Sequence, residues 1–551
     1  MGNKQREKKS RASWWDKANQ TLAENHSMLV TAAFIIYLFF SFFTFSLRIS
    51  EGGDDSAYII RAISFLEEGK FPQFQGPLYP FILSLFIALF GTRIVVLKLS
   101  SWIFLSLSVF LLGKAIVNKV SAITFWGIIL ALVVNHHFLY FGSQTYSEAF
   151  FMALQSFFIL YLFRTIEKHE NHPIPAHHVL AISVLLLTLY LTRTIAIVAV
   201  PAVVLFFFLR NQKKAAWLTI LFFVVLSGAF IGLKAIVADS PTGGDSQLQS
   251  LLMKHPYDAS QGRETFGGFF ERFAQNSNIY LSKYFAILTG FKNAMSLSKQ
   301  SLVTILLYIW FIAGMIGFYR RNPYLLFIGI YLIFLLGTTF FALHTIWDQV
   351  RLIIPFYPLM IIFLIETVVA YTSKSKTAGK QKIPAVLLAF TILLSTAQTV
   401  KQTDFQATFK NISGDQYYGY TPDWQNYLKM VEFASHNLPP ESYIACRKPN
   451  IARLTAGGKE FYGIYRIDSE NADTLITQLY NRGVTHIIVA SLRKNPRMRT
   501  GQVINTIHRY MKHIADKYPG TFILRKQIGE TEPAWLFEVN YNIWQQKNKE
   551  E

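Results

Sequence analysis

Glu51-Gly-Gly-Asp-Asp-Ser-Ala-Tyr58 is the first polar segment after an uncharged apolar run that extends from Met28 to Leu47. That run has about the 20 residues that a helix needs to cross the hydrocarbon core of a bilayer. The polar segment therefore places two adjacent carboxylates, Asp54 and Asp55, at a membrane surface. Because most of the chain after this loop consists of further apolar runs, the sequence predicts a membrane enclosure built around the loop.

Composition supports an integral membrane protein. The 551 residues are 52% hydrophobic and only 16% charged, whereas soluble domains carry about 25% charged residues. The net charge of +20 raises the question of nucleic-acid binding, but much of the Lys and Arg lies in short loops between apolar runs, and no nucleic-acid-binding motif accompanies it. We therefore expect no nucleic acid among the partners. The single Cys446 excludes an intrachain disulfide framework and a cysteine-based metal site.

Charge bias gives an orientation to the apolar runs. Residues 1–27 form a basic tail that the positive-inside rule keeps in the cytoplasm, and a cleaved signal peptide would have a shorter apolar core than the run that follows. The apolar stretch 77–90 is too short to span and is expected to be a juxtamembrane helix. About 11 spans then alternate so that the basic loops between them face the cytoplasm. These spans are 28–47, 94–113, 121–139, 147–163, 177–192, 194–209, 215–237, 301–319, 323–343, 351–371 and 383–400.

The run from Val179 to Leu209 is interrupted only by Arg193. A single long helix would bury this Arg near the middle of the bilayer, at a cost of at least ~2.5 kcal/mol. Two short helices would place Arg193 at the outer surface and would also keep the charge bias. We therefore expect two helices.

The fold class that follows is a polytopic α-helical membrane domain, residues 28–400, with a C-terminal soluble α/β domain, residues 401–551. The membrane domain presents a first outer loop, 48–76, and a long outer loop, 238–300. In the C-terminal part the apolar runs shorten and turn signals appear. The elements expected there are helices over about 421–437 and 471–482, and strands over 442–447, 459–465, 484–490, 521–527 and 535–540.

Three acidic residues are candidates for chemistry on the predicted outer side. Asp54 and Asp55 precede a helical pattern, so each is either a helix N-cap or a general base that deprotonates an acceptor hydroxyl. Because neighbours on a turn point in different directions, one can act as the base while the other caps. Glu148 begins a span, where the helix dipole alone favours a carboxylate. Its functional alternatives are to orient the acceptor or, with the Asp pair, to hold a divalent metal.

Three cations lie near the predicted outer ends of spans, namely Arg193, Arg351 and Lys98. Arg offers a planar fork of donors that suits the oxygens of a lipid phosphate, although such side chains also snorkel to headgroups without further function. No metal-ligand spacing links the candidate histidines, and the chain has neither a phosphate-cradling Gly-rich loop nor a nucleophile elbow. ATP-driven transport and serine hydrolysis therefore have no support. The histidines considered are His136, His137, His255 and His344.

Taken together, these features resemble the GT-C superfamily of polytopic glycosyltransferases that use polyprenyl-phosphate sugars, especially the branch with aminoarabinose transferases and protein O-mannosyltransferases. The chain departs from the family pattern in having Asp55 where Glu is usual, Glu148 where Asp is usual, and Gly76 in place of one Pro. The resemblance rests on Asp54-Asp55-Ser-Ala-Tyr58, Gln75-Gly-Pro-Leu-Tyr-Pro80, Thr192-Arg193 and Arg351-Leu-Ile-Ile-Pro355.

The resemblance implies transfer of a sugar from a polyprenyl-phosphate donor to a hydroxyl of a lipid, glycan or protein acceptor, by inverting single displacement at the extracytoplasmic face of a bacterial cytoplasmic membrane. An Asp would act as the base, and Arg193, Arg351 and Lys98 would hold the donor phosphate. Tyr58, Tyr79 and His344 would contact substrate, and metal use varies within the superfamily. The alternatives are a flippase for lipid-linked oligosaccharides, which would need a polar cavity along several spans, and a polysaccharide polymerase or ligase.

Overall fold

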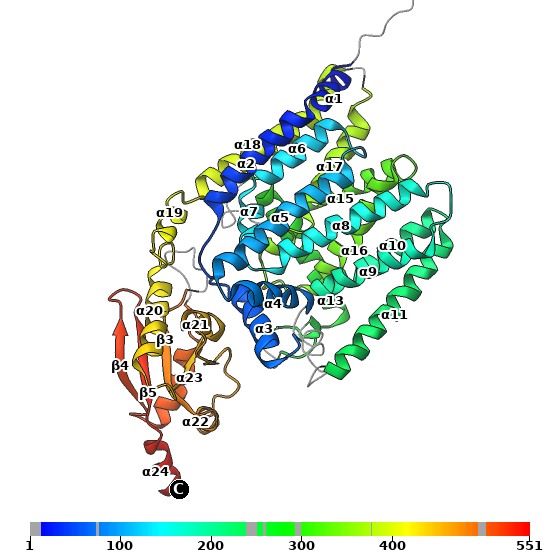
Figure 1. Ribbon diagram of the computed structural model, residues 1–551. Coiled ribbons are helices and arrows are strands. Elements are labelled where there is room, and N and C mark those ends of the chain that lie inside the picture. The colour runs from blue at the N-terminus through cyan, green and yellow to red at the C-terminus, as the bar shows by residue number, and fades with distance from the viewer. Residues whose placement is uncertain are drawn as a thin grey trace, which may run out of the picture. The chain divides into compact units, whose positions relative to one another are not determined.

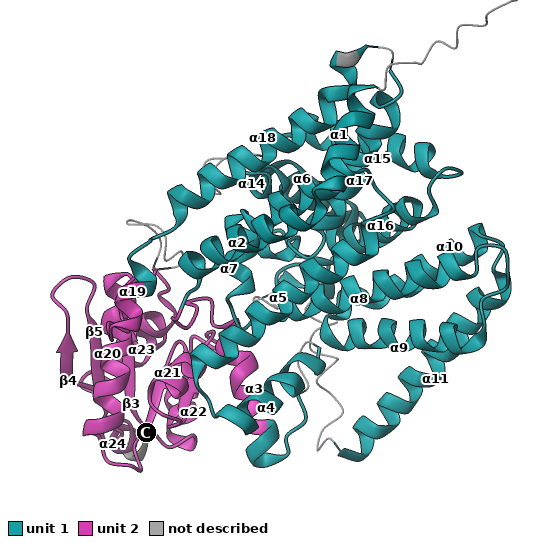
Figure 2. Cartoon of the chain, turned by 45° about the horizontal axis from the view of Figure 1, so that its top comes forward, with its two compact units in different colours: residues 1–46, 65–408 teal, residues 47–64, 409–551 magenta. Residues whose placement is uncertain are grey.

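The chain divides into two compact units, which Figure 2 distinguishes by colour. Residues 1–46 and 65–408 form a helical unit, and residues 47–64 and 409–551 form an α/β unit. The computed structural model describes residues 13–72, 76–237, 251–256, 261–291, 299–375, 377–493 and 503–550, so that Gln75, Lys376 and residues 1–12 of the basic tail lie outside the described residues. The segment that carries Asp54 and Asp55 folds with the C-terminal part of the chain.

The helical unit consists of helices joined mostly by short turns (Figure 1). Helix α3, Asp54–Glu68, crosses the boundary between the two units, as does α19, Ala407–Ile412. The remaining helices of this unit are α1 (Trp14–Glu24), α2 (His26–Thr44), α4 (Leu78–Phe90), α5 (Ile94–Ile116), α6 (Ala122–Val133), α7 (His136–Gly142), α8 (Ser147–Lys168), α9 (Ala176–Thr192), η1 (Thr194–Val198), α10 (Ala199–Leu209), α11 (Lys213–Val237), α13 (Phe266–Ser277), η3 (Asn278–Tyr284), α14 (Phe285–Leu288), α15 (Ser301–Phe318), α16 (Pro323–Ala342), η4 (Val350–Leu352), α17 (Tyr357–Thr372) and α18 (Ala378–Gln402).

Membrane-spanning helices dominate this unit, and the predicted fold class is confirmed. Within the described residues, seven helices are long and apolar enough to cross a membrane, and the pair α6 and α7, bent by 61°, makes an eighth if it is counted as one span. The other three predicted spans coincide with the shorter apolar helices α9, α10 and α17, while α4 occupies the stretch predicted to be juxtamembrane. The long helices are α2, α5, α8, α11, α15, α16 and α18.

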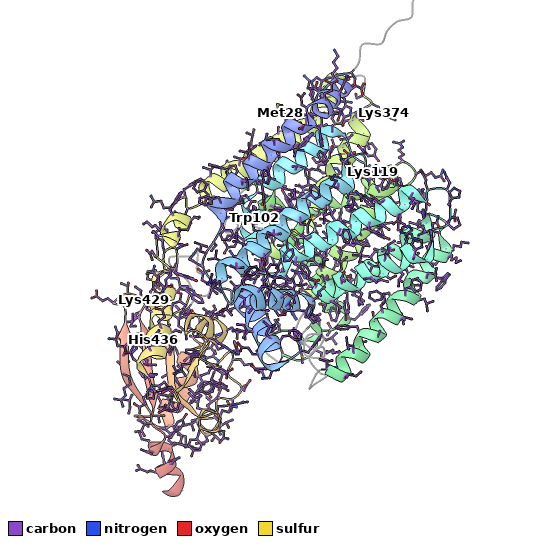
Figure 3. All side chains as sticks on the ribbon, viewed as in Figure 1. Met28, Trp102, Lys119, Lys374, Lys429 and His436 are labelled. Atoms are coloured by element: carbon purple, nitrogen blue, oxygen red, sulfur yellow. The ribbon has the colours of Figure 1, made fainter. Side chains whose placement is uncertain are left out.

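Buried polar side chains tie the helices together inside the unit. Helices α5 and α8 lie side by side through its centre (Figure 1). Gln155 on α8 donates to the backbone carbonyl of Pro355 at 2.8 Å and lies 3.2 Å from the hydroxyl of Tyr331 on α16. At the end of α5, Lys119 pairs with Glu167 at 2.6 Å. Lys119 and Lys374 lie toward the same end of the helical unit (Figure 3).

Arg193 lies at a break between two helices. Helix α9 ends at Thr192, and Arg193 itself is extended, with φ −143° and ψ 120°. The 3-10 helix η1 and then α10 follow it. The expected division of the apolar run 179–209 into two helices is therefore present, and Arg193 lies in the extended link between them.

The C-terminal unit is a five-stranded sheet with strand order β2-β1-β3-β5-β4. Strand β1 pairs in parallel with β2 and β3, while β5 pairs antiparallel with β3 and β4. All five expected strands are present, and Pro422 opens a helix as expected. The elements of this unit are β1 (Tyr443–Cys446), β2 (Phe461–Gly463), β3 (Val484–Ala490), β4 (Phe522–Ile528), β5 (Ala534–Val539), α20 (Pro422–Asn437), α21 (Pro449–Thr455), α22 (Ala472–Asn481), α23 (Thr506–Lys517) and α24 (Asn542–Glu550).

The two faces of the sheet pack against different helices. Ile488 of β3 faces a core with Trp424 and Tyr427 of α20, whereas its neighbours Ile487 and Val489 face a second core built from α22 and α23. This alternation is the period of two that a strand imposes on its side chains. The near-continuous apolar sequence of β3 follows from its burial on both faces.

Candidate active site

The segment 144–148, between α7 and α8, brings together the three cations that the sequence singles out. Its residues at alternate positions each contact one of them. Lys98 Nζ donates to Gln144 Oε1 at 2.9 Å, and Arg193 Nη1 lies 2.9 Å from Glu148 Oε1. The guanidinium carbon of Arg351 lies 5.0 Å from the centre of the Tyr146 ring, which is cation–π distance. Three predicted phosphate ligands from distant parts of the sequence therefore converge on five residues.

Burial strengthens the electrostatic interactions within this cluster. Lys98 has no exposed surface, and the side chains of Glu148 and Arg193 are only 4% and 17% exposed. A buried charge is stable only if it is paired and hydrogen-bonded. The four charged side chains carry three positive charges and one negative charge, so the cluster keeps a positive excess. Such an excess in a site of low dielectric attracts an anion.

Gly76 explains how the end of α9 is held. A Cβ atom at this position would lie 2.2 Å from the carbonyl oxygen of Thr192 and 2.4 Å from that of Leu191. The backbone of residue 76 therefore packs directly against the last turn of α9, immediately before Arg193. Any side chain there would collide with backbone atoms, which accounts for Gly at the position where the resembling family has Pro.

The turn 344–351, which carries Arg351, is held by the π-helix η3. Tyr280 donates its hydroxyl to the carbonyl of Trp347 at 3.0 Å, and Tyr284 donates to the carbonyl of Asp348 at 2.6 Å. Lys283 pairs with the Asp348 carboxylate at 2.6 Å. A π-helix is rare and frequently occurs at functional sites.

Sequence reasoning missed these three residues because it treated 238–300 as one long loop. The described parts of that loop contain α13, η3 and α14. A signal was present in the spacing, since Asn276, Tyr280 and Tyr284 recur at four-residue intervals, as polar anchors on one helical face do.

The acidic loop belongs to the α/β unit, and its two aspartates have different surroundings. Gly53 has a positive φ of 88°, which ends the turn before α3 begins at Asp54. Asp55 is 1% exposed, and its two carboxylate oxygens accept from the backbone N–H groups of Ser50 and Ser56, both at 2.7 Å. Asp54 is half-buried. Asp55 thus closes the turn, as a capping carboxylate does.

The predicted substrate contacts Tyr58, Tyr79 and His344 are buried side chains. The ring of Tyr58 lies 5.5 Å from the guanidinium of Arg61. Tyr79 has no exposed surface, and its hydroxyl is 3.3 Å from Ser101 Oγ. His344 packs edge-on against Trp347, with ring centres 4.9 Å apart. These contacts fix the segments that carry the motifs, and the role of the three side chains toward substrate stays a prediction.

The observed contacts do not favour a metal site. Among the residues that the structure describes, no group of three or more His, Cys, Asp or Glu side chains is arranged to hold a metal ion. Glu148 is ion-paired with Arg193, and Asp55 uses both oxygens on backbone N–H groups. Of the carboxylates proposed from sequence as metal ligands, Glu148 and Asp55 therefore have other partners, and we assign no step to a metal.

Comparisons with known proteins point to one fold. No protein-family model matches the sequence, and no curated protein matches it. Among solved structures, the chain is similar to ArnT from Cupriavidus metallidurans in the apo state, with 11% identity over 95% of this chain and 99% of that one, at a TM-score of 0.53. The same protein bound to undecaprenyl phosphate matches with 10% identity over 94% and 98%, at a TM-score of 0.51.

A second similar structure is the archaeal oligosaccharyltransferase AglB from Archaeoglobus fulgidus, in complex with an inhibitory peptide and a dolichol-phosphate. It matches with 12% identity over 96% of this chain and 75% of that one, at a TM-score of 0.51. At such identities the likeness concerns the fold. The chain therefore has the fold of the GT-C glycosyltransferases, as its sequence motifs predict.

Proposed function

We propose that the protein is a membrane glycosyltransferase that moves a sugar from a polyprenyl-phosphate donor to an acceptor hydroxyl at the extracytoplasmic face. The observation that carries the proposal is the convergence of Lys98, Arg193 and Arg351 on the segment 144–148. Guanidinium and ammonium groups that share a partly buried site bind a phosphate by charge-assisted hydrogen bonds. In this reaction a phosphate is both the anchor of the donor and the leaving group.

The chemistry assigned to the site is a single displacement. Asp54 takes the proton of the acceptor hydroxyl, whose oxygen forms a bond to the anomeric carbon of the sugar. The bond between that carbon and the phosphate oxygen breaks on the opposite face, and its electron pair leaves with the polyprenyl phosphate. The configuration at the anomeric carbon is inverted. The cations stabilise the charge that develops on the leaving group, so that no protonating acid is required.

The choice of Asp54 as the base follows from the surroundings of the two aspartates. Asp55 is buried, and each of its carboxylate oxygens accepts a backbone N–H bond of the turn, which gives this residue a structural role. Asp54 is half-buried at the N-terminus of α3. The mechanism requires the acidic loop and the cation cluster to act on the same donor, which is a part of the proposal that mutagenesis tests.

The lipid carrier is proposed from the neighbours in fold. One was solved with undecaprenyl phosphate and another with a dolichol-phosphate, and both ligands are polyprenyl chains that end in a phosphate. An isoprenoid tail suits a domain in which seven described helices are long enough to cross a membrane. We propose that the protein lies in a bacterial cytoplasmic membrane, with its C-terminal domain on the extracytoplasmic side.

Binding of undecaprenyl phosphate tests the site without knowledge of the sugar. Full-length protein in lipid nanodiscs is titrated with undecaprenyl phosphate and, as a control, with undecaprenol, which lacks the charge. We expect saturable binding of the phosphate that is lost when the cations of the cluster are neutralised. Lys119→Met is the matched control, because Lys119 is also ion-paired but contacts Glu167. Equal binding of both lipids would contradict the phosphate assignment.

Turnover tests the reaction itself. The protein is incubated with polyprenyl-phosphate sugars that carry a radiolabelled hexose or pentose, together with bacterial envelope extract as the source of acceptors. Release of polyprenyl phosphate coupled to labelling of an acceptor supports the proposal. Movement of the labelled lipid across proteoliposome membranes without transfer would instead support a flippase and would overturn it.

A further inference from the structure

Lys448 connects the C-terminal α/β fold to the acidic loop. It lies between strand β1 and helix α21, where it is the N-cap residue of α21. Its Nζ donates to the backbone carbonyls of Glu51 and Gly52, both at 3.2 Å. These two carbonyls directly precede Gly53 and Asp54. The contact therefore joins the C-terminal fold to the start of the proposed catalytic helix, across 396 positions of sequence.

The fit between Lys448 and the loop is close. A Cβ atom at Gly53 would lie 3.7 Å from Lys448 Nζ and 3.8 Å from Ile451 Cδ1 on α21. The turn therefore packs against the N-terminal end of that helix. A second contact holds the other side of the turn, because the hydroxyl of Tyr420 donates to the carbonyl of Ile49 at 2.7 Å. The backbone from 49 to 53 is thus fastened at both ends to residues of the C-terminal fold.

Lys448 is itself held rigidly. The hydroxyl of Tyr427 on α20 donates to the Lys448 carbonyl at 3.2 Å, and the Trp424 ring lies 5.9 Å from its Nζ. Both aromatic residues are 1% exposed and belong to the core that covers one face of the sheet. Lys448 thus links the core on this face of the sheet to the loop, through its backbone carbonyl on one side and its ammonium group on the other.

We propose that Lys448 is a positioning residue for Asp54, which it orients by holding the carbonyls of Glu51 and Gly52. The α/β domain is then part of the catalytic machinery and not only an appendage of the membrane domain. This inference rests on the proposed function in so far as it takes Asp54 to be the base.

The test compares Lys448→Met and Lys448→Arg with Lys429→Met in the full-length protein. Lys429 is an exposed lysine of the same domain, on α20, that contacts the ring of Tyr417 (Figure 3). Hydrogen exchange is followed in peptides that cover residues 48–57, where the amides of Ser50, Gly53, Ser56 and Ala57 are bonded within the loop. We expect exchange to rise at least tenfold in Lys448→Met, less in Lys448→Arg, and not at all in Lys429→Met.

Kinetics provide the second readout. With a polyprenyl-phosphate sugar as donor, we expect Lys448→Met to lower kcat at least tenfold while KM for the donor changes less than twofold, and Lys448→Arg to recover part of the loss. Unchanged exchange in Lys448→Met would overturn the inference, as would raised exchange with wild-type kcat. If the wild-type protein transfers no sugar, the proposed function fails, whereas the exchange data still decide whether Lys448 orders the loop.

Discussion

The guanidinium of Arg193 lies 2.9 Å from the carboxylate of Glu148, which joins the break between α9 and α10 to the first turn of α8. Both side chains are largely buried, so each is the other's main compensation for lost solvation. The pair holds Arg193 in place within the cation cluster. A donor phosphate that binds Arg193 would meet Glu148 as a competing anion.

Replacement of Glu148 by Gln tests this competition. The amide oxygen of Gln can still accept from Arg193, but the negative charge is gone. We therefore expect Glu148→Gln to bind undecaprenyl phosphate several-fold more tightly than the wild type, because repulsion between the carboxylate and the phosphate is removed. Binding is measured by titration in nanodiscs. Weaker binding would show that the carboxylate is needed to place Arg193, and would contradict the competition.

Substitutions of Arg193 test the phosphate contact. We expect Arg193→Ala to weaken binding of undecaprenyl phosphate by about 10- to 100-fold, which corresponds to the loss of one charged hydrogen bond. Arg193→Lys should weaken it less, since it keeps the charge and loses the planar fork. Undecaprenol serves as the reference ligand in the same titrations. Wild-type affinity in both variants would remove Arg193 from the site.

The two aspartates should respond differently to replacement by Asn. Asp54→Asn should leave the melting temperature almost unchanged and lower the transfer rate by about 10²- to 10⁴-fold, the usual contribution of a general base. Asp55→Asn puts an NH₂ group where a carboxylate oxygen accepts a backbone N–H, so it should destabilise the protein by about 1–3 kcal/mol. Rates and thermal unfolding of both variants separate the roles. The assignment would be reversed if Asp55→Asn were stable and inactive while Asp54→Asn stayed active.

Gly76→Ala tests the backbone contact that positions Arg193. The new methyl group would overlap the carbonyl oxygen of Thr192, so we expect a loss of at least about 1–3 kcal/mol of stability, together with weaker phosphate binding. Gly337→Ala on α16 is the control, because its Cβ would meet no atom within 4 Å and Ala favours the helix. Thermal unfolding in detergent compares the two. Equal melting temperatures in both variants would mean that the close approach at Gly76 is not required.

The pH dependence of stability should reflect Lys448. Burial lowers the pKa of Lys448 to about 8 from an ordinary value of 10.5, and the neighbouring Arg447 acts in the same direction. Between these two values the unfolded state binds more protons than the folded state, so the free energy of unfolding rises with pH across this window. Below about pH 8 Lys448 is protonated in both states, so it no longer changes the free energy of unfolding as the pH falls.

Lys448→Met removes this titration and provides the baseline. We expect the free energy of unfolding of the wild type, minus that of Lys448→Met, to increase from pH 8 to pH 10 and to be flat from pH 6 to pH 7. Denaturant unfolding of full-length protein at each pH measures it. If the free energy of unfolding of the wild type relative to Lys448→Met fell between pH 8 and pH 10, folding would raise the pKa of Lys448, which would contradict the prediction.

Local sequence was sufficient for most of the secondary structure. Each apolar run predicted to be a span coincides with a helix, whereas α13, η3 and α14 lie in the stretch 238–300 that was expected to be a loop. Arg193 alone indicates the break between α9 and α10, because an unpaired charge is costly inside a bilayer. Alternation and turn residues predict all five strands of the C-terminal sheet. Helices α21 and α23 were not expected. Helix α21 is short, whereas α23 does carry a signal, because its buried residues Ile507, Tyr510, Met511 and Ile514 follow the i, i+3, i+4, i+7 spacing of an amphipathic helix.

The sequence by itself determined which residues carry charge at the ends of spans and which side chains suit a base or a phosphate ligand. Only the tertiary structure decided that Lys98, Arg193 and Arg351 meet on the segment 144–148, and that Asp55 is committed to its own turn. It also decided that the acidic loop folds with the C-terminal domain through Lys448. Helix and strand formation depend on residues a few positions apart in the sequence. Ion pairs, and the packing of a loop against another segment, depend on contacts between residues that can be hundreds of positions apart.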